Sequence, residues 1–328
     1  MAATRRGILA AGAALALGAA RPAQAQTRWQ AATPWADGNS HTRNLHDFLS
    51  EVRLTTGGAL DIRLYADGAL LKSGEILRGL QTGQVQVGDL LLALASPLDP
   101  ILELDSLPML VRSLDEARHL TMLTRPLIEQ RLRREGLTVL YLAPWPPPGL
   151  FSGFVVDSLQ SLRGTRMRTM SPSAARMASL AGALSAPIEP EQGTPLSLAA
   201  PLATTMFASA CTGVDVAAWS FARFYMPMDI AFPKNAVCAQ SRAWEALPSQ
   251  QRQKLHQAAQ AAEERAWAMA SSEPPVAQRV LASHGVTVRA PGPELLAELE
   301  HLGQTMLAEW RVRAGEAGTR VLDALRAG

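Results

Sequence analysis

Three arginines stand within six residues of the segment 162–171, Leu-Arg-Gly-Thr-Arg-Met-Arg-Thr-Met-Ser. The segment has the pattern of a turn followed by a short strand that ends before Pro172. An arginine at the end of a strand suits a small organic anion, because its planar guanidinium donates two parallel hydrogen bonds to one carboxylate. From these ten residues alone, a basic turn on a solvated edge is the simpler explanation, so the choice depends on the rest of the chain.

Residue groupings that are typical of enzymes are missing from the sequence. It contains no Gly-x-Ser-x-Gly elbow, no His-Glu-x-x-His pair, no Walker loop and no Gly-x-Gly-x-x-Gly turn. The six histidines are scattered, and no carboxylates pair as an acid and a base. We therefore predict a binding protein and no enzyme, with no cofactor. An exported hydrolase with an unrecognised site is the alternative.

The charge balance argues against nucleic acid as a partner. The 31 Lys and Arg and 29 Asp and Glu residues give a formal net charge of +2. They form no basic face and do not alternate with aromatic residues. Removal of a leader that contains Arg5, Arg6 and Arg21 would lower this charge by three, to −1.

Residues 1–25 have the features of an export signal. The charged pair Arg5-Arg6 precedes an apolar run, and Ala23-Gln24-Ala25 fits a small-x-small cleavage site. The run is shorter than the roughly 20 residues that span a bilayer. The arginine pair indicates a twin-arginine signal, and an ordinary secretory signal with two chance arginines is the alternative. We expect a periplasmic mature protein that begins near Gln26.

Two cysteines, Cys211 and Cys238, remain in this oxidising compartment. Their separation in sequence says nothing about the geometry that a disulfide needs. The pairing therefore stays open. With no third cysteine and no Cys-x-x-Cys motif, the thiols do not indicate a zinc or redox site.

Hydrophobic periodicity predicts alternating strands and helices in the first half of the chain. We expect strands at 28–33, 60–65, 85–91 and 138–142, and helices at 41–55, 73–82 and 114–135. This order favours parallel strands joined by crossover helices. The segment 144–149 contains four prolines and a glycine and continues neither element, so we place the first domain crossing there.

The second half of the chain is predicted to continue the α/β pattern. We expect strands at 151–156, 214–218, 235–240 and 286–288, and helices at 173–182, within 195–211, at 242–247 and at 248–272, followed by two closing helices. The helix at 248–272 is the longest of those expected, about 37 Å at 1.5 Å per residue. It is long enough to lie across two domains.

The order of these motifs resembles that of the solute-binding proteins of tripartite ATP-independent periplasmic (TRAP) transporters, the dicarboxylate-binding type. The resemblance covers nearly the whole mature chain. It is sharpest at 161–168, Ser-Leu-Arg-Gly-Thr-Arg-Met-Arg, which is similar to the family's "D-L-K-G-x-K-I-R". Further matching segments lie at 56–71, 75–89, 104–117, 212–219 and 235–248.

The resemblance implies an α/β, two-lobed periplasmic-binding-protein fold with a hinge and a long domain-spanning helix. We expect residues 26–148 and 236–273 to form lobe I, and residues 149–235 and 274–328 to form lobe II. It also implies capture of a small organic acid by lobe closure and delivery to TRAP permease membrane subunits. A ligand-reporting partner of a sensor kinase is an alternative use of the same fold. We favour a monomer.

The resemblance also assigns site residues. It implies that Arg168 binds the substrate carboxylate. One branch of the family holds a metal ion with a glutamate where this chain has Ala218, so we predict no metal site. A second arginine of some relatives has no counterpart in the uncharged segment 149–154. Aromatic walls for the ligand are expected from Trp35, Trp145, Phe151, Trp219 and Tyr225, with core packing as the alternative for each. One cation with aromatic walls predicts an apolar or aromatic monocarboxylate.

Overall fold

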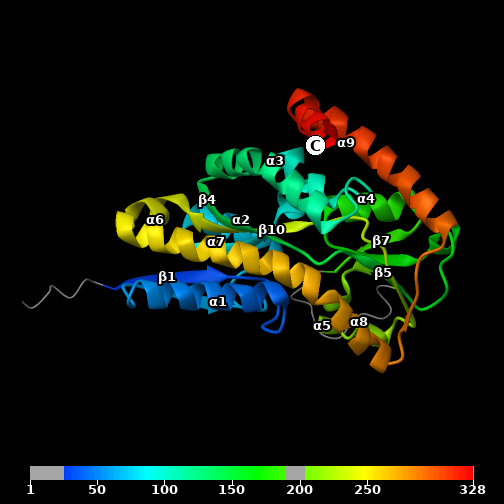
Figure 1. Cartoon of the computed structure of the whole chain (residues 1–328), viewed down its shortest axis with the longest axis horizontal. Helices are drawn as coiled ribbons and strands as arrows, with labels where there is room; N and C mark the ends of the chain where they lie inside the picture. Colours follow the sequence, from blue (N-terminus) through cyan, green and yellow to red (C-terminus); the bar gives the residue numbers. More distant parts are fainter. Residues whose placement is uncertain (1–25, 189–203, 328) are drawn as a thin grey trace, which may run out of the picture.

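The computed structural model describes residues 26–188 and 204–327, which form an α/β molecule built on two β-sheets. Figure 1 shows the strands of the first sheet with α1, α2 and α6, and the strands of the second sheet beside α5 and α8. The predicted fold class is therefore confirmed. The expected signal segment, residues 1–25, lies outside the described residues.

The first sheet has the strand order β2-β1-β3-β10-β4. Its bounds are β1 Thr27–Ala32, β2 Leu60–Tyr65, β3 Val87–Leu91, β4 Leu137–Pro144 and β10 Lys234–Gln240. Strand β1 pairs in parallel with β2 and β3, as the crossover pattern predicted. Strand β10 comes from the distant part of the chain and lies antiparallel between β3 and β4.

The second sheet has the order β11-β9-β5-β8-β6-β7. Its bounds are β5 Gly149–Ser152, β6 Arg166–Thr169, β7 Leu184–Pro187, β8 Thr205–Ala208, β9 Phe224–Pro227 and β11 Thr287–Val288. Strand β6 lies in parallel between β7 and β8. A helix begins at Pro172, shortly after the carboxyl end of β6. Ligands of open α/β sheets bind at such carboxyl ends of strands.

Helices cover both sheets. Their bounds are α1 Ser40–Thr55, α2 Ile76–Thr82, α3 Leu114–Arg134, α4 Pro172–Leu180, α5 Ala210–Asp215, α6 Ser241–Ala246, α7 Ser249–Ser272, α8 Pro274–Ser283 and α9 Pro293–Ala327. Helix α7 packs against α1 and β4 and runs on to α8, which packs on α5 (Figure 1). It thus reaches from the first sheet to the helices of the second. Within the described residues, no helix combines the length and the apolar composition needed to cross a bilayer.

Two sequence-based predictions of elements are wrong. The expected helix within 195–211 lies partly outside the described residues, and its described part contains strand β8. The expected strand at 214–218 is instead the end of α5 and the start of a short 3-10 helix, because Ser209 caps a helix there. The prediction of the longest helix is confirmed: α7, with 24 residues, is the longest unbroken helix among the described residues, because α9 consists of two helices that meet at a kink at Gly315, where φ is 59°.

The chain passes between the two sheets at residues 145–148, at 228–233 and at the junction of α7 with α8. A buried ion pair lies beside the second of these passages, with 2.9 Å between Lys234 Nζ and Asp105 Oδ2. The expected lobe boundaries stay a prediction. Strand β10 of the first sheet begins at Lys234, which is two residues before the boundary expected at 236.

The possible disulfide is not formed in this structure. Cys211 and Cys238 are both free thiols.

Candidate functional site

A cavity of about 160 Å³ lies between the two sheets, and residues of both sheets line it. Its lining includes the predicted residues Trp35, Trp145 and Arg168. Among the described lining residues, Arg168 is the only one with a charged side chain. The remaining lining is apolar apart from a few hydroxyl groups, those of Ser106, Ser171, Ser173, Ser209 and Thr212.

Strand β6 places Arg168 at this cavity. Arg166 is exposed at the start of the strand, whereas the next three residues are buried and Arg168 is only 5% exposed. Arg168 pairs with Ala186 on one side and with Met206 on the other. Its Nε donates to the backbone oxygen of Ile188 at 3.3 Å, and its Nη1 lies 3.4 Å from the sulfur of Met206. These contacts hold a buried guanidinium at the cavity wall.

Two indole rings form the opposite wall. Trp35 follows β1 and Trp145 follows β4, and their ring centroids are 4.6 Å apart at an interplanar angle of 73°. The imidazole of His41 stacks on the Trp145 ring, with centroids 4.0 Å apart. From the other sheet, Met170 packs against the same apolar cluster. Because Met170 follows the strand of Arg168, the indole wall and the cation face one cavity.

A buried polar network lies behind the indole wall. Trp145 Nε1 donates to Asn235 Oδ1 at 2.7 Å, and Asn235 Nδ2 donates to Asp89 Oδ1 at 2.7 Å. Thr33 Oγ1 donates to the second Asp89 oxygen at 3.0 Å. Burial raises the pKa of Asp89 to about 6, and the hydrogen bonds from Asn235 and Thr33 oppose this shift.

The starts of two helices reach the cavity from the second sheet. Ser171 accepts a hydrogen bond from the backbone N–H of Ala174 and so caps α4, and Ser209 caps α5 through the N–H of Thr212. Sequence reasoning missed these hydroxyl groups. A signal was present at α4, because Ser171 precedes Pro172 and a serine before a proline is typical of a helix start.

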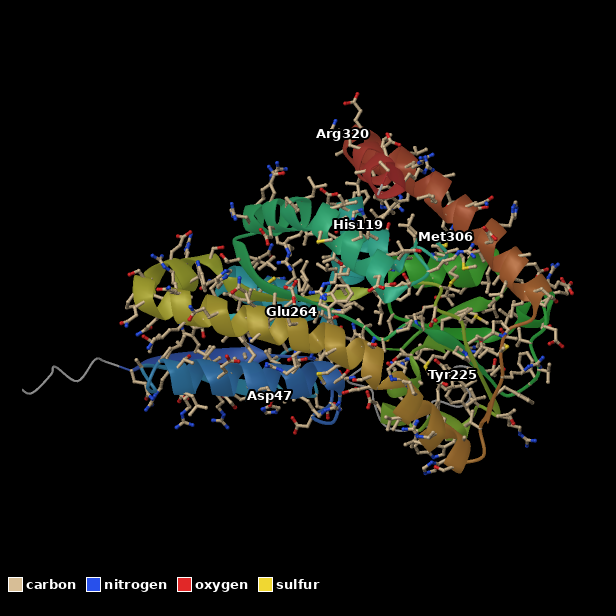
Figure 2. The ribbon with its side chains drawn as sticks, in the orientation of Figure 1. Asp47, His119, Tyr225, Glu264, Met306 and Arg320 are labelled. Atoms are coloured by element: carbon tan, nitrogen blue, oxygen red, sulfur yellow. The ribbon has the colours of Figure 1, made fainter. Side chains whose placement is uncertain are left out.

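The other three predicted residues do not line the cavity. Phe151 stacks on Tyr225 with ring centroids 4.4 Å apart, and both are fully buried in the core that α5 and α8 cover. Figure 2 shows Tyr225 in that part of the molecule, between the second sheet and α8. Trp219 stacks on His284 at 3.9 Å on the same side.

Close packing of glycines explains why these rings stay in the core. A Cβ on Gly213 would lie 2.2 Å from the Phe151 ring, and one on Gly149 would lie 2.6 Å from the Tyr225 ring. The rings therefore fill space that only glycine leaves open. The cavity has another aromatic lining residue, Phe207 on β8, which the sequence did not single out because that strand was expected to be helical.

The described residues contain no group of three or more His, Cys, Asp or Glu side chains placed to hold a metal ion. The cavity residues that the structure describes include neither a histidine nor a cysteine. What the arrangement offers is a buried cation, a flat aromatic wall and several hydroxyl groups. This combination suits a small anion.

Known proteins show the same fold. Residues 31–192 match the family model described as bacterial extracellular solute-binding protein, family 7. The structure is similar to that of DctP7, a Bordetella pertussis extracytoplasmic solute receptor binding pyroglutamic acid, with a TM-score of 0.89, 36% identity, and coverage of 92% of this chain and 99% of that one. The structure is also similar to that of DctP6, a receptor of the same organism that binds pyroglutamic acid. The TM-score is 0.90 and the identity 31%, and the match covers 92% of this chain and 100% of that one.

A third similar structure is a marine metagenome TRAP solute-binding protein specific for pyroglutamate, with a TM-score of 0.89 and 28% identity. The match covers 93% of this chain and 100% of the metagenome protein. These relatives are receptors, so the hydrolase alternative is set aside. The chain therefore belongs to family 7 of the bacterial extracellular solute-binding proteins, and it is a periplasmic TRAP-type receptor and not an enzyme.

Proposed function

We propose that this receptor binds a small organic monocarboxylate in the Arg168 cavity, with L-pyroglutamate as the first candidate. The observation that carries this proposal is the charge of the lining. Among the described residues of the cavity, Arg168 alone is charged, and it is 95% buried. A second carboxylate on the ligand would enter an apolar cavity without a cation to balance it, which is costly. One carboxylate therefore fits better than two.

The shape and the polar groups of the cavity support a compact ring with a neutral polar edge. Pyroglutamate is a nearly flat lactam with one carboxylate. Its ring suits the wall formed by Trp35 and Trp145, and its amide suits the hydroxyl groups of Ser209 and Thr212. The sequence predicted a ligand with an apolar or aromatic group beside its carboxylate. We now propose that this group is a flat ring that carries an amide. The ligands of DctP7 and DctP6 support this choice.

Binding is expected to need no covalent step. The carboxylate pairs with Arg168, the ring covers the indole wall, and closure of the two halves shields the ion pair from water. Water exclusion strengthens that pair, because the attraction between charges grows as the dielectric constant falls. A dissociation constant near 1 μM corresponds to about −8 kcal/mol, which one buried ion pair and one buried ring can supply. The loaded receptor then delivers the acid to the TRAP permease.

Isothermal titration calorimetry with L-pyroglutamate tests the proposal. Arg168→Ala should weaken binding at least about 100-fold, because a buried carboxylate without its partner costs several kcal/mol. Arg166→Ala is the matched control, since it removes an exposed arginine from the same strand. It should bind like the wild type. Unchanged affinity of Arg168→Ala would exclude this cavity as the carboxylate site.

Mass spectrometry of the native purified protein provides a second test. A co-purified acid with a single carboxylate would support the proposed ligand class. A co-purified dicarboxylate would contradict it, because the described lining contains one charged side chain.

A further inference from the structure

The indole of Trp145 is held from three directions. His41 stacks on one face at 4.0 Å, and Trp35 meets the ring edge-on at 4.6 Å. In the plane of the ring, the indole Nε1 donates to Asn235 Oδ1 at 2.7 Å. The contacts with His41 and Trp35 restrict tilting of the indole ring. The hydrogen bond to Asn235 restricts rotation of the ring within its own plane. The ring is 8% exposed and lines the ligand cavity.

The hydrogen-bond chain behind this ring can run in only one direction. An indole nitrogen is a donor only, so Asn235 must turn its amide oxygen toward Trp145. Its amide NH₂ group then points to Asp89, and the distance is 2.7 Å. An ionised carboxylate only accepts hydrogen bonds, so it suits the end of the chain. Asn235 is fully buried and Asp89 is 1% exposed, so water does not replace these bonds.

The same carboxylate is also linked, through Thr33, to the backbone of the second tryptophan. Thr33 donates to Asp89 Oδ2 at 3.0 Å, and the Thr33 hydroxyl accepts from the backbone N–H of Trp35 at 3.4 Å. Asp89 is thus the common acceptor for a network that reaches the ring of Trp145 and the backbone of Trp35. Asp89 lies on β3 and Asn235 on β10, which are paired strands, so the network rests on the rigid first sheet.

We propose that Asn235 and Asp89 are positioning residues, which hold the Trp145 ring as a rigid wall and so make the cavity prefer a planar ring over a flexible chain. This inference rests on the proposed monocarboxylate function. A rigid flat wall contacts the whole face of a preformed ring. A flexible ligand must lose rotamer freedom to lie flat on it, which reduces its affinity. A mobile wall would adapt to both ligands and reduce the difference between them.

The test compares two ligands that carry the same groups. L-pyroglutamate is cyclic, and N-acetylglycine is an acyclic amide with one carboxylate. Asn235→Ala removes the bond to the indole, and Asp89→Asn keeps an acceptor for Asn235 but removes its charge. Asn44→Ala is the matched control, because Asn44 is equally buried and donates to the Ala262 backbone oxygen at 2.9 Å outside the ligand cavity.

We expect Asn235→Ala to lower the ratio of pyroglutamate affinity to N-acetylglycine affinity by about tenfold, the effect of one buried hydrogen bond. Asp89→Asn should lower it by a smaller factor, and Asn44→Ala should leave it unchanged. Equal losses for both ligands in Asn235→Ala would show a merely structural role and overturn the proposal. An unchanged ratio would overturn it as well.

A ligand-free measurement separates this inference from the proposed function. In the ¹H–¹⁵N spectrum of the apo protein, the indole N–H of Trp145 should shift and broaden in Asn235→Ala and keep its position in Asn44→Ala. If the wild type binds neither acid, the proposed ligand is wrong, and this spectrum still decides whether Asn235 immobilises the ring. An unaltered Trp145 signal in a folded Asn235→Ala protein would overturn the inference.

Discussion

Asn39 and Asp215 are 176 residues apart and join the two halves of the molecule by a hydrogen bond of 2.7 Å from Asn39 Nδ2 to Asp215 Oδ2. Asn39 caps α1 on the side of the first sheet, and Asp215 ends α5 on the side of the second. The cavity residues Trp35 and Thr212 lie a few residues from this bond on the same two segments. The bond therefore links segments that the proposed closure would bring together.

Asn39→Ser should speed ligand release without touching the cavity. Serine still caps α1, because its hydroxyl accepts from the helix N–H groups, but it is too short to reach Asp215. The loss of a half-buried hydrogen bond to a carboxylate is expected to raise the dissociation rate by about tenfold. Stopped-flow fluorescence of the tryptophans near the cavity measures this rate.

Asn39→Asp serves as the repulsive counterpart. It keeps the cap but places a second carboxylate beside Asp215, whose pKa burial already raises. At pH 7 the ligand should be released faster from Asn39→Asp than from Asn39→Ser. The difference between the two release rates should shrink at lower pH, because protonation neutralises the two neighbouring carboxylates. A release rate equal to that of the wild type in both variants would show that the bond does not stabilise the closed form.

His41 predicts a loss of stability toward acid. Burial lowers its pKa from 6.5 to about 3. Between these values the unfolded chain binds a proton that the native protein does not bind, so the free energy of unfolding falls as the pH falls. From pH 7 to pH 5 this contribution amounts to about 2 kcal/mol.

Urea denaturation of the wild type and of His41→Gln at the two pH values isolates this contribution. The free energy of unfolding of the wild type should fall by about 2 kcal/mol more than that of the variant, whatever their difference at pH 7. Parallel losses in the two proteins would mean that His41 titrates normally in the native state.

The buried pair of Lys234 and Asp105 should be costly to break and easy to replace. Lys234 is 1% exposed, and burial raises the pKa of Asp105 although Lys234 opposes the shift. Lys234→Met leaves this carboxylate without its cation and should cost about 3–5 kcal/mol in guanidinium denaturation. The double variant Lys234→Met, Asp105→Leu should regain most of that loss, and a double variant as unstable as the single one would refute this account.

Gly303 is a position in α9 where alanine should be harmful. Alanine normally stabilises a helix by about 1 kcal/mol relative to glycine. Here a Cβ would lie 2.3 Å from the backbone oxygen of Pro108, and overpacking of this kind costs about 1–3 kcal/mol. We expect a net loss near 1 kcal/mol in thermal or chemical unfolding.

Gly292→Ala is the control for that substitution. No atom lies within 4 Å of a Cβ at this position, just before α9, so its effect should stay within about 0.5 kcal/mol of zero. A stabilising Gly303→Ala would mean that α9 does not pack closely on the loop that precedes α3.

The amino-acid sequence by itself determined the elements whose signals are local. The alternation in Leu60–Tyr65 and the apolar spacing of α1 depend only on neighbouring residues, and both elements appear where they were predicted. Arg168 was singled out by the resemblance of 161–168 to the family's "D-L-K-G-x-K-I-R" and not by its local pattern, and the structure places it at the cavity. Strand β8 was missed, since it is paired on both sides in the sheet and shows no alternating pattern.

Only the tertiary structure decided which aromatic rings meet Arg168. Phe151 and Tyr225 looked as suitable as Trp35 and Trp145 in the sequence, because each belongs to a strand or follows one. The face to which a strand residue points depends on how that strand pairs, and pairing joins segments that are far apart in the chain. The two sheets turn Phe151 and Tyr225 into the core beside α5 and α8, and they leave the two tryptophans at the cavity.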